Sequence, residues 1–104
     1  MLDAARHSGH ANRKSVFEVF SRRLPGGRRY GVVAGTGRLL DEIEAFRFGQ
    51  PELDFLRERK VVSDDTLEWL ADFKFSGSIR GYREGELYFP HSPILQVEAP
   101  FAEA

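Results

Sequence analysis

The chain has 104 residues, of which 41% are hydrophobic and 30% are charged, and its net charge is −1. This length suits one domain, residues 1–104, and the composition excludes an intrinsically disordered segment. The absence of cysteine excludes disulfides and thiolate metal sites, and no apolar run approaches the ~20 residues of a membrane helix, so we expect a cytoplasmic protein.

The N-terminal residues predict the last part of a helix. Met1–Ser8 contains good helix formers, and Gly9 is a suitable stop. His7 and His10 stand three positions apart, a spacing that can place two imidazoles on one helix face. Because Gly9 separates them and no cysteine or carboxylate cluster accompanies them, we expect solvated histidines and no metal site.

The next segment, Ser15–Leu24, has the composition of a β-strand. Its apolar side chains are β-branched or aromatic and fall on both alternating faces: Val16, Phe17, Val19 and Phe20. A strand of this kind is typically covered on both sides, so we expect it at the centre of a sheet. Pro25 and the two glycines after it end the strand in a turn.

Four arginines surround this turn: Arg22, Arg23, Arg28 and Arg29. Residues 1–38 hold eight Lys or Arg against two acidic residues, whereas residues 39–104 hold seven against fourteen. A basic N-terminal half favours a phosphate-bearing partner such as a nucleotide, pyrophosphate or nucleic acid. The alternative is that the basic and acidic halves pair within the fold or across a dimer.

Arg22 and Arg23 are the candidate phosphate-binding residues. A guanidinium group can hold two phosphate oxygens at once. Because neighbouring residues in a strand face opposite sides, only one of the two can enter a given cleft. We favour Arg22, which shares its face with Val16 and Phe20. The alternative is a solvated strand end.

The glycine-rich stretch Gly31–Gly37 does not predict a phosphate-binding loop. Its spacing matches neither GxxxxGK nor GxGxxG, and no Lys-Ser or Lys-Thr follows its last glycine. We expect Gly35 to permit close packing or a local bend. From Val32 to Phe46 the apolar residues follow the helical interval, which predicts a helix.

Two further helices are predicted before the chain becomes β. Pro51 suits the first turn of a helix over Glu52–Lys60. Ser63 is the predicted N-cap of the next helix, whose first turn contains two aspartates that complement the helix dipole. Capping explains this acidic pair, so we assign it no catalytic role. The apolar face of this last helix contains Leu67, Trp69, Leu70 and Phe73.

The C-terminal third predicts three strands: Phe75–Arg83, Glu86–Phe89 and Ile94–Glu98. Arg83-Glu84-Gly85 is the expected turn between the first two, and prolines mark the second connection. One long strand, about three helices and a C-terminal antiparallel meander indicate an α+β fold.

Two stretches of the chain resemble a known family. FEVFSRRLPGGRRYGVVAGTGRLLDEIEAF resembles the start of nicotinate phosphoribosyltransferases, which have a phenylalanine-glutamate strand, a basic pair, a proline and a glycine-bearing helix. SDDTLEWLADFKFSGSIRGYREGELYFPHSPILQVEAPFAEA is similar to the following part of these enzymes, including its glycine-led strand and EG turn. The resemblance extends over nearly all of the chain beyond Arg13.

This resemblance implies the fold of the N-terminal domain of a type II phosphoribosyltransferase, whose first motif and β/α barrel are expected outside this chain. It implies an enzyme that makes nicotinate mononucleotide from nicotinate and phosphoribosyl pyrophosphate with ATP hydrolysis and Mg²⁺. It also implies a homodimer, in which Arg22 or Arg23 contributes to the neighbouring subunit's site. We expect no catalytic residue in this chain, no cofactor bound by it alone, and no activity from it alone.

Two other classes remain as alternatives. A non-catalytic basic module for phosphate-bearing ligands or nucleic acid would use the arginines for backbone contacts and the aromatics for stacking. A carrier domain of the biotinyl or lipoyl type would need a lysine at its hairpin tip, and the predicted turn contains Arg83-Glu84-Gly85 instead. We expect nucleic acid not to be the partner, because Phe17 and Phe20 belong to the two-faced apolar strand.

Overall fold

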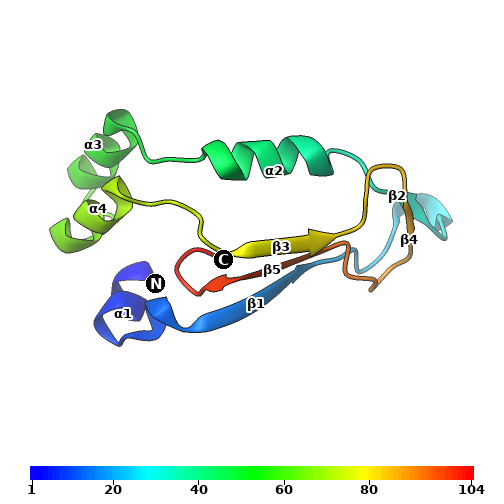
Figure 1. Cartoon of the computed structure of the whole chain (residues 1–104), viewed down its shortest axis with the longest axis horizontal. Helices are drawn as coiled ribbons and strands as arrows, with labels where there is room; N and C mark the ends of the chain where they lie inside the picture. The colour runs from blue at the N-terminus through cyan, green and yellow to red at the C-terminus, as the bar shows by residue number, and fades with distance from the viewer.

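The computed structural model describes the whole chain, residues 1–104, as an α+β arrangement of four α-helices and five β-strands (Figure 1). The helices are α1 (Leu2–His7), α2 (Thr36–Ala45), α3 (Gln50–Glu58) and α4 (Asp64–Ala71). The strands are β1 (Lys14–Val19), β2 (Gly31–Val32), β3 (Ser78–Gly81), β4 (Leu87–Tyr88) and β5 (Leu95–Pro100). Short 3-10 turns lie at His10–Asn12 and Pro25–Gly27. The predicted α+β class is confirmed, and none of the helices is both long and apolar enough to span a bilayer.

The main sheet is antiparallel and has the strand order β1-β5-β3 (Figure 1). Val97 of β5 is opposite Phe17 of β1 on one side and Ile79 of β3 on the other. The predicted C-terminal meander is therefore wrong, because β5 pairs with both of its neighbours and β4 leaves this sheet. The expected central strand is also shorter than predicted: β1 ends at Val19 and forms an edge of the sheet.

A second, two-stranded sheet pairs β2 with β4. Gly31 fits against the ring of Tyr88, and a Cβ at this position would lie 2.5 Å from that ring. The helix predicted from Val32 thus begins later, at Thr36, because the residues before it pair with β4. Gly35 caps α2 with a φ of 86°, the left-handed conformation that glycine adopts without strain, which confirms the expected local bend.

The helical end of the molecule contains the only packed cluster of buried residues, made by Leu53 of α3 with Leu67 and Leu70 of α4. The sequence predicts both helices, although α3 begins and ends two residues earlier than the predicted range Glu52–Lys60. Pro51 lies in the first turn of α3, and the Ser63 hydroxyl accepts a hydrogen bond from the Thr66 N–H at 3.4 Å. These signals are local, so the sequence was sufficient to place these helices.

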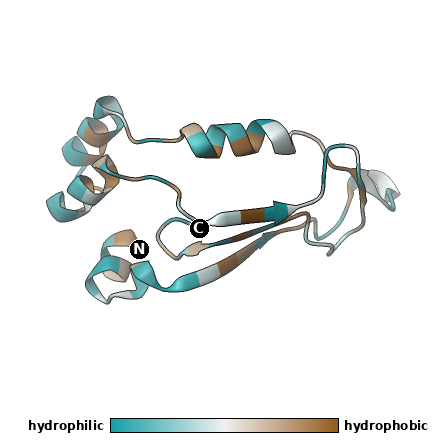
Figure 2. Ribbon diagram, in the orientation of Figure 1, coloured by the Kyte–Doolittle hydropathy of each residue, from teal (hydrophilic) through white to brown (hydrophobic).

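The two faces of the main sheet differ in chemistry. On the polar face, Glu98 forms ion pairs with Lys14 at 2.6 Å and Arg80 at 3.8 Å. The hydrogen bond from Lys14, then its positive charge, hold the pKa of Glu98 below its ordinary value. The apolar face contains Phe17, Val97 and Ile79 in register. Figure 2 shows brown segments along these strands and along α2.

The molecule is elongated, with extents of 47 × 28 × 25 Å and a Cα radius of gyration of 16.8 Å, whereas a compact domain of this length has about 13 Å. Only nine residues are buried. Phe17 remains 44% exposed, so the prediction that its strand is covered on both sides is wrong within this chain. Large apolar side chains are exposed along the sheet and α2, among them Val16, Val19, Phe20, Leu39, Leu40 and Phe46.

Candidate functional site

The four arginines predicted to bind phosphate lie in one loop, Phe20–Tyr30, which we call the arginine segment. It connects β1 to β2 at the end of the molecule opposite α3 and α4 (Figure 1). Its turn contains Gly26 and Gly27 with φ values of 64° and 71°, a left-handed conformation that suits the glycine pair. The sequence therefore correctly predicted a glycine turn at this place.

Backbone hydrogen bonds hold the beginning of the arginine segment to the chain that precedes β5. The His91 N–H donates to the Ser21 carbonyl at 2.8 Å, and the Ile94 N–H donates to the Val19 carbonyl at 2.9 Å. The rings of Phe20 and His91 lie with their centroids 6.2 Å apart. The first residues of the segment are thus fixed to the residues that precede β5, although they lie beyond the end of β1.

Arg22, Arg23, Arg28 and Arg29 are all exposed, and none of their guanidinium groups makes a hydrogen bond or ion pair within the chain. Other basic residues of the N-terminal half do pair with the acidic half. Arg6 contacts Asp65 at 2.8 Å, and Lys14 contacts Glu98 at 2.6 Å. Internal pairing therefore accounts for part of the charge asymmetry, and it leaves the four guanidinium groups of this segment free for an external anion.

The structure does not support the preference for Arg22 over Arg23. It assumed that both arginines continue the strand, but β1 ends at Val19 and the chain then turns. Ser21 closes this turn by donating a hydrogen bond to the Arg23 carbonyl at 2.9 Å. Arg22 and Arg23 consequently stand as neighbours on an irregular loop, where strand alternation does not decide which of them faces a ligand.

The remaining titratable groups do not form a metal site. His7 lies 2.7 Å from the carbonyl of Asp3, and His10 lies 3.0 Å from the Ser8 hydroxyl, so each histidine makes a local contact. No three His, Asp or Glu side chains gather in a way that could hold a metal ion.

The N-terminus of α2 is occupied by a carboxylate from another part of the chain. Glu84 accepts hydrogen bonds from the N–H groups of Gly35 at 3.0 Å and Gly37 at 3.1 Å. In this structure, two of the amides that could bind an anion at this helix N-terminus therefore bind a carboxylate of the same chain. The sequence prediction missed Glu84, because this residue lies 47 to 49 positions away from the amides that it binds.

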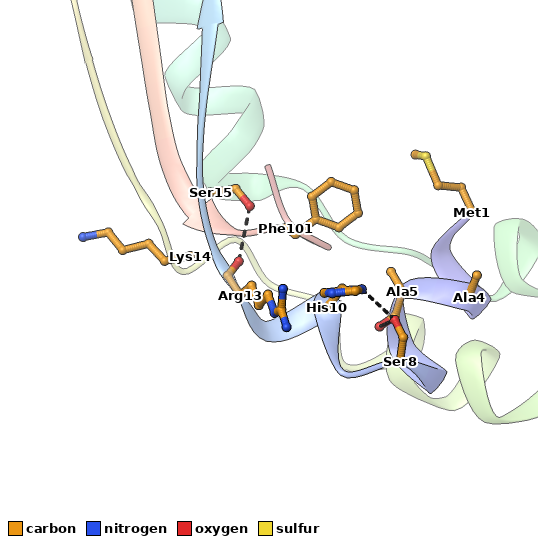
Figure 3. A pocket seen from close by; sticks show the side chains of 9 residues that line it. All are labelled: Met1, Ala4, Ala5, Ser8, His10, Arg13, Lys14, Ser15 and Phe101. Carbon is orange, nitrogen blue, oxygen red and sulfur yellow. Dashed lines mark hydrogen bonds between the residues drawn. The ribbon is translucent and has the colours of Figure 1, made fainter.

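A pocket with a volume of about 500 Å³ lies at the other end of β1 (Figure 3). Its apolar side contains Phe101, and its basic side contains His10 and Arg13. Its lining serine hydroxyls are used locally, because Ser8 binds His10 and Ser15 donates to the Arg13 carbonyl at 3.3 Å. Lys14 points away from the other lining side chains (Figure 3) and forms the ion pair with Glu98. None of the lining residues belongs to the arginine segment, so this pocket is separate from it.

Comparisons with known proteins agree with the resemblance read from the sequence. The model of the nicotinate phosphoribosyltransferase N-terminal domain matches residues 1–104. The chain is 54% identical over 103 residues to nicotinate phosphoribosyltransferase pncB1 of Mycobacterium tuberculosis, and this match covers 99% of the chain and 22% of the relative. It is 36% identical to the Bacillus subtilis nicotinate phosphoribosyltransferase, a match that covers 100% of the chain and 21% of the relative.

The fold agrees with a solved structure of the same family. The crystal structure of human nicotinic acid phosphoribosyltransferase matches with a TM-score of 0.86 and 28% identity, over 99% of this chain and 21% of the human chain. The chain thus spans about a fifth of the length of these relatives. It belongs to the nicotinate phosphoribosyltransferase family and corresponds to the family's N-terminal domain.

Proposed function

We propose that this chain is the N-terminal portion of an enzyme that makes nicotinate mononucleotide from nicotinate and phosphoribosyl pyrophosphate with ATP hydrolysis. The observation that carries the proposal is the match of the N-terminal domain family along the whole chain. The unpaired arginines of the arginine segment support it, because both sugar-phosphate substrate and pyrophosphate product are polyanions. The enzyme serves NAD biosynthesis from nicotinate.

The arginine segment would bind and neutralise phosphate oxygens. When the nitrogen of nicotinate attacks the anomeric carbon, the bond from that carbon to pyrophosphate breaks and negative charge develops on the leaving oxygen. A guanidinium held near this oxygen stabilises the charge and fixes the direction of departure. Arg22 and Arg23 are the residues of this chain that we assign to this contact.

Other parts of the activity would come from residues outside this chain. The chain spans about a fifth of the length of its relatives, and it contains no group of three or more His, Asp or Glu side chains that could hold a metal ion. We therefore propose that Mg²⁺ and ATP bind elsewhere in the complete enzyme. We also propose a cytoplasmic homodimer in which the arginine segment contacts the active site of the neighbouring subunit, because an exposed loop at the tip of an elongated domain can reach across an interface.

The test compares the full-length enzyme with the 104-residue chain. Each is incubated with nicotinate, phosphoribosyl pyrophosphate, ATP and Mg²⁺, and nicotinate mononucleotide is measured by chromatography. We expect product from the full-length enzyme and none above a buffer blank from the chain alone. A full-length protein without this activity would overturn the proposed reaction. Turnover by the isolated chain would overturn the proposal that the activity needs residues outside this chain.

A further inference from the structure

Glu84 connects two parts of the chain that are far apart in sequence. Its two carboxylate oxygens accept one hydrogen bond each, from Gly35 N–H at 3.0 Å and from Gly37 N–H at 3.1 Å. Because Gly35 is the N-cap and has no side chain, α2 has no capping group of its own. The carboxylate also faces the positive end of the helix dipole, so charge and hydrogen bonding act in the same direction.

The residues that follow Glu84 extend this connection. The Gly85 N–H donates to the Val33 carbonyl at 2.8 Å, and the Val33 N–H donates to the Glu86 carbonyl at 2.9 Å. Gly85 has a φ of 83°, which places its N–H in this turn without strain. Glu84, Gly85 and Glu86 thus make four hydrogen bonds to residues 33–37. We call this set of bonds the Glu84 clamp.

The clamp holds the end of the arginine segment. Residues 33–37 follow β2 directly, and β2 follows Tyr30, the last residue of the segment. The beginning of the segment is held by the hydrogen bond from the His91 N–H to the Ser21 carbonyl, and Val19, the residue just before the segment, is held by the Ile94 N–H. Both ends of the arginine segment are consequently fixed to one stretch of chain, residues 84–94, while the guanidinium groups between them have no internal partner.

We propose that Glu84 is a positioning residue that holds the arginine segment in place for phosphate binding. This inference rests on the proposed function, because it gives the segment the same ligand. Glu84 contacts no substrate in this proposal; it acts through the helix N-terminus and β2. Without this clamp, repulsion among the four unpaired arginines would favour a disordered loop. The free energy needed to order the loop would then weaken phosphate binding.

Hydrogen–deuterium exchange of the full-length enzyme tests the clamp itself. In Glu84→Ala, peptides that cover residues 31–39 should exchange about fivefold faster, the effect typical of losing a helix N-cap. The exchange rate in Glu84→Gln should lie between those of wild type and Glu84→Ala, because one amide oxygen can still accept a hydrogen bond. Glu44→Gln removes an exposed carboxylate from the same helix that has no side-chain partner, and it should leave exchange unchanged. Unchanged exchange in Glu84→Ala would overturn the clamp.

A double-mutant cycle tests whether the clamp acts through the arginines. We expect Glu84→Ala to lower kcat/KM for phosphoribosyl pyrophosphate about fivefold in the wild-type background, with partial recovery in Glu84→Gln. In the Arg22→Ala, Arg23→Ala background the same change should have less than about twofold effect. Full additivity would overturn the positioning role. If the double arginine variant itself keeps wild-type kcat/KM, the assignment of Arg22 and Arg23 to phosphate binding is wrong. The hydrogen–deuterium exchange experiment then tests the clamp independently of this assignment.

Discussion

Asp3 connects the N-terminal helix to α4. Its carboxylate accepts hydrogen bonds from the Ser63 N–H and the Ser63 hydroxyl, both at 3.0 Å. The Thr66 hydroxyl contributes most to holding the pKa of Asp3 below its ordinary value of 3.8, and the Ser63 groups add to it against the partial loss of hydration. Ser63 also caps α4, so one serine serves both elements.

The depressed pKa of Asp3 predicts acid sensitivity of this contact. Because the unfolded chain binds a proton at a higher pH than the folded one, the stabilisation is complete above pH 3.8 and is lost as the pH falls through the lower, folded pKa. The midpoint of thermal unfolding of the N-terminal domain, measured from pH 6 down to about pH 2, should therefore fall more steeply in wild type than in Asp3→Asn. Identical slopes would contradict the assignment.

For the contacts of single residues, the sequence predicts local partners and misses distant ones. Ser63 as an N-cap depends on Thr66 three residues later, and Pro51 depends only on the turn that it begins. The partners of Asp3 and Glu84 lie 47 to 60 residues away in the chain. A single sequence contains no signal for such pairs, because many other acidic residues could have supplied the same hydrogen bonds.

Among the elements, β5 organises the main sheet and β1 lies at its edge. Phe17 is opposite Val97 and 6.2 Å from the ring of Phe101, yet it stays 44% exposed. Leu70 of α4 is 4% exposed and belongs to the buried cluster with Leu53 and Leu67. The same loss of side-chain volume should therefore cost more in the helical end than on the sheet.

This comparison predicts different stability losses for two alanine variants of the 104-residue chain. Leu70→Ala should cost ~2–5 kcal/mol, the range for a buried leucine, whereas Phe17→Ala should cost about half the ~3–5 kcal/mol of a buried phenylalanine. Urea unfolding followed by the fluorescence of Trp69, the single tryptophan, gives both values. A larger loss for Phe17→Ala than for Leu70→Ala would show that the sheet, and not the helical cluster, is the stable part.

The sequence predicted the type of most elements and not their partners. The spacing of apolar residues assigns Val32 and Val33 to the start of a helix, whereas hydrogen bonding to β4 and to Glu86 decides their conformation. The meander failed for a related reason: the turn at Glu84 and Gly85 exists, but it directs the chain to β2. Strand order depends on contacts between distant residues, which local patterns do not contain.

The whole molecule has a packed helical end and an exposed arginine end, and the main sheet lies between them (Figure 1). Phe17, Val97 and Ile79 share the apolar face of this sheet. Nine buried residues among 104 are few for a domain of this length, and the radius of gyration exceeds that of a compact chain. Val16, Phe17 and Val19 of β1 and Leu39 and Leu40 of α2 all stay exposed, and exposed apolar patches favour association.

The isolated chain should consequently bind an apolar dye. We expect strong anilinonaphthalene sulfonate fluorescence and concentration-dependent association of the 104-residue chain, because exposed apolar patches and an open edge strand favour both. Dye fluorescence and light scattering at several concentrations measure these properties. A chain that stays monomeric and does not bind the dye would show that the exposed sheet face and α2 close against each other in solution.

We propose that the arginine segment contacts phosphate, and this contact is tested by kcat/KM for phosphoribosyl pyrophosphate in the full-length enzyme. Losing a charge-assisted, two-point contact costs ~1.5–3 kcal/mol, so at least one of Arg22→Ala and Arg23→Ala should lose about ten- to a hundredfold. Arg59→Ala, which removes an exposed arginine at the helical end, should stay within about twofold, and replacing the sensitive arginine by lysine should recover only part of the loss. Wild-type kcat/KM in both alanine variants, with unchanged thermal stability, would show that neither Arg22 nor Arg23 contacts the phosphate groups of the substrate.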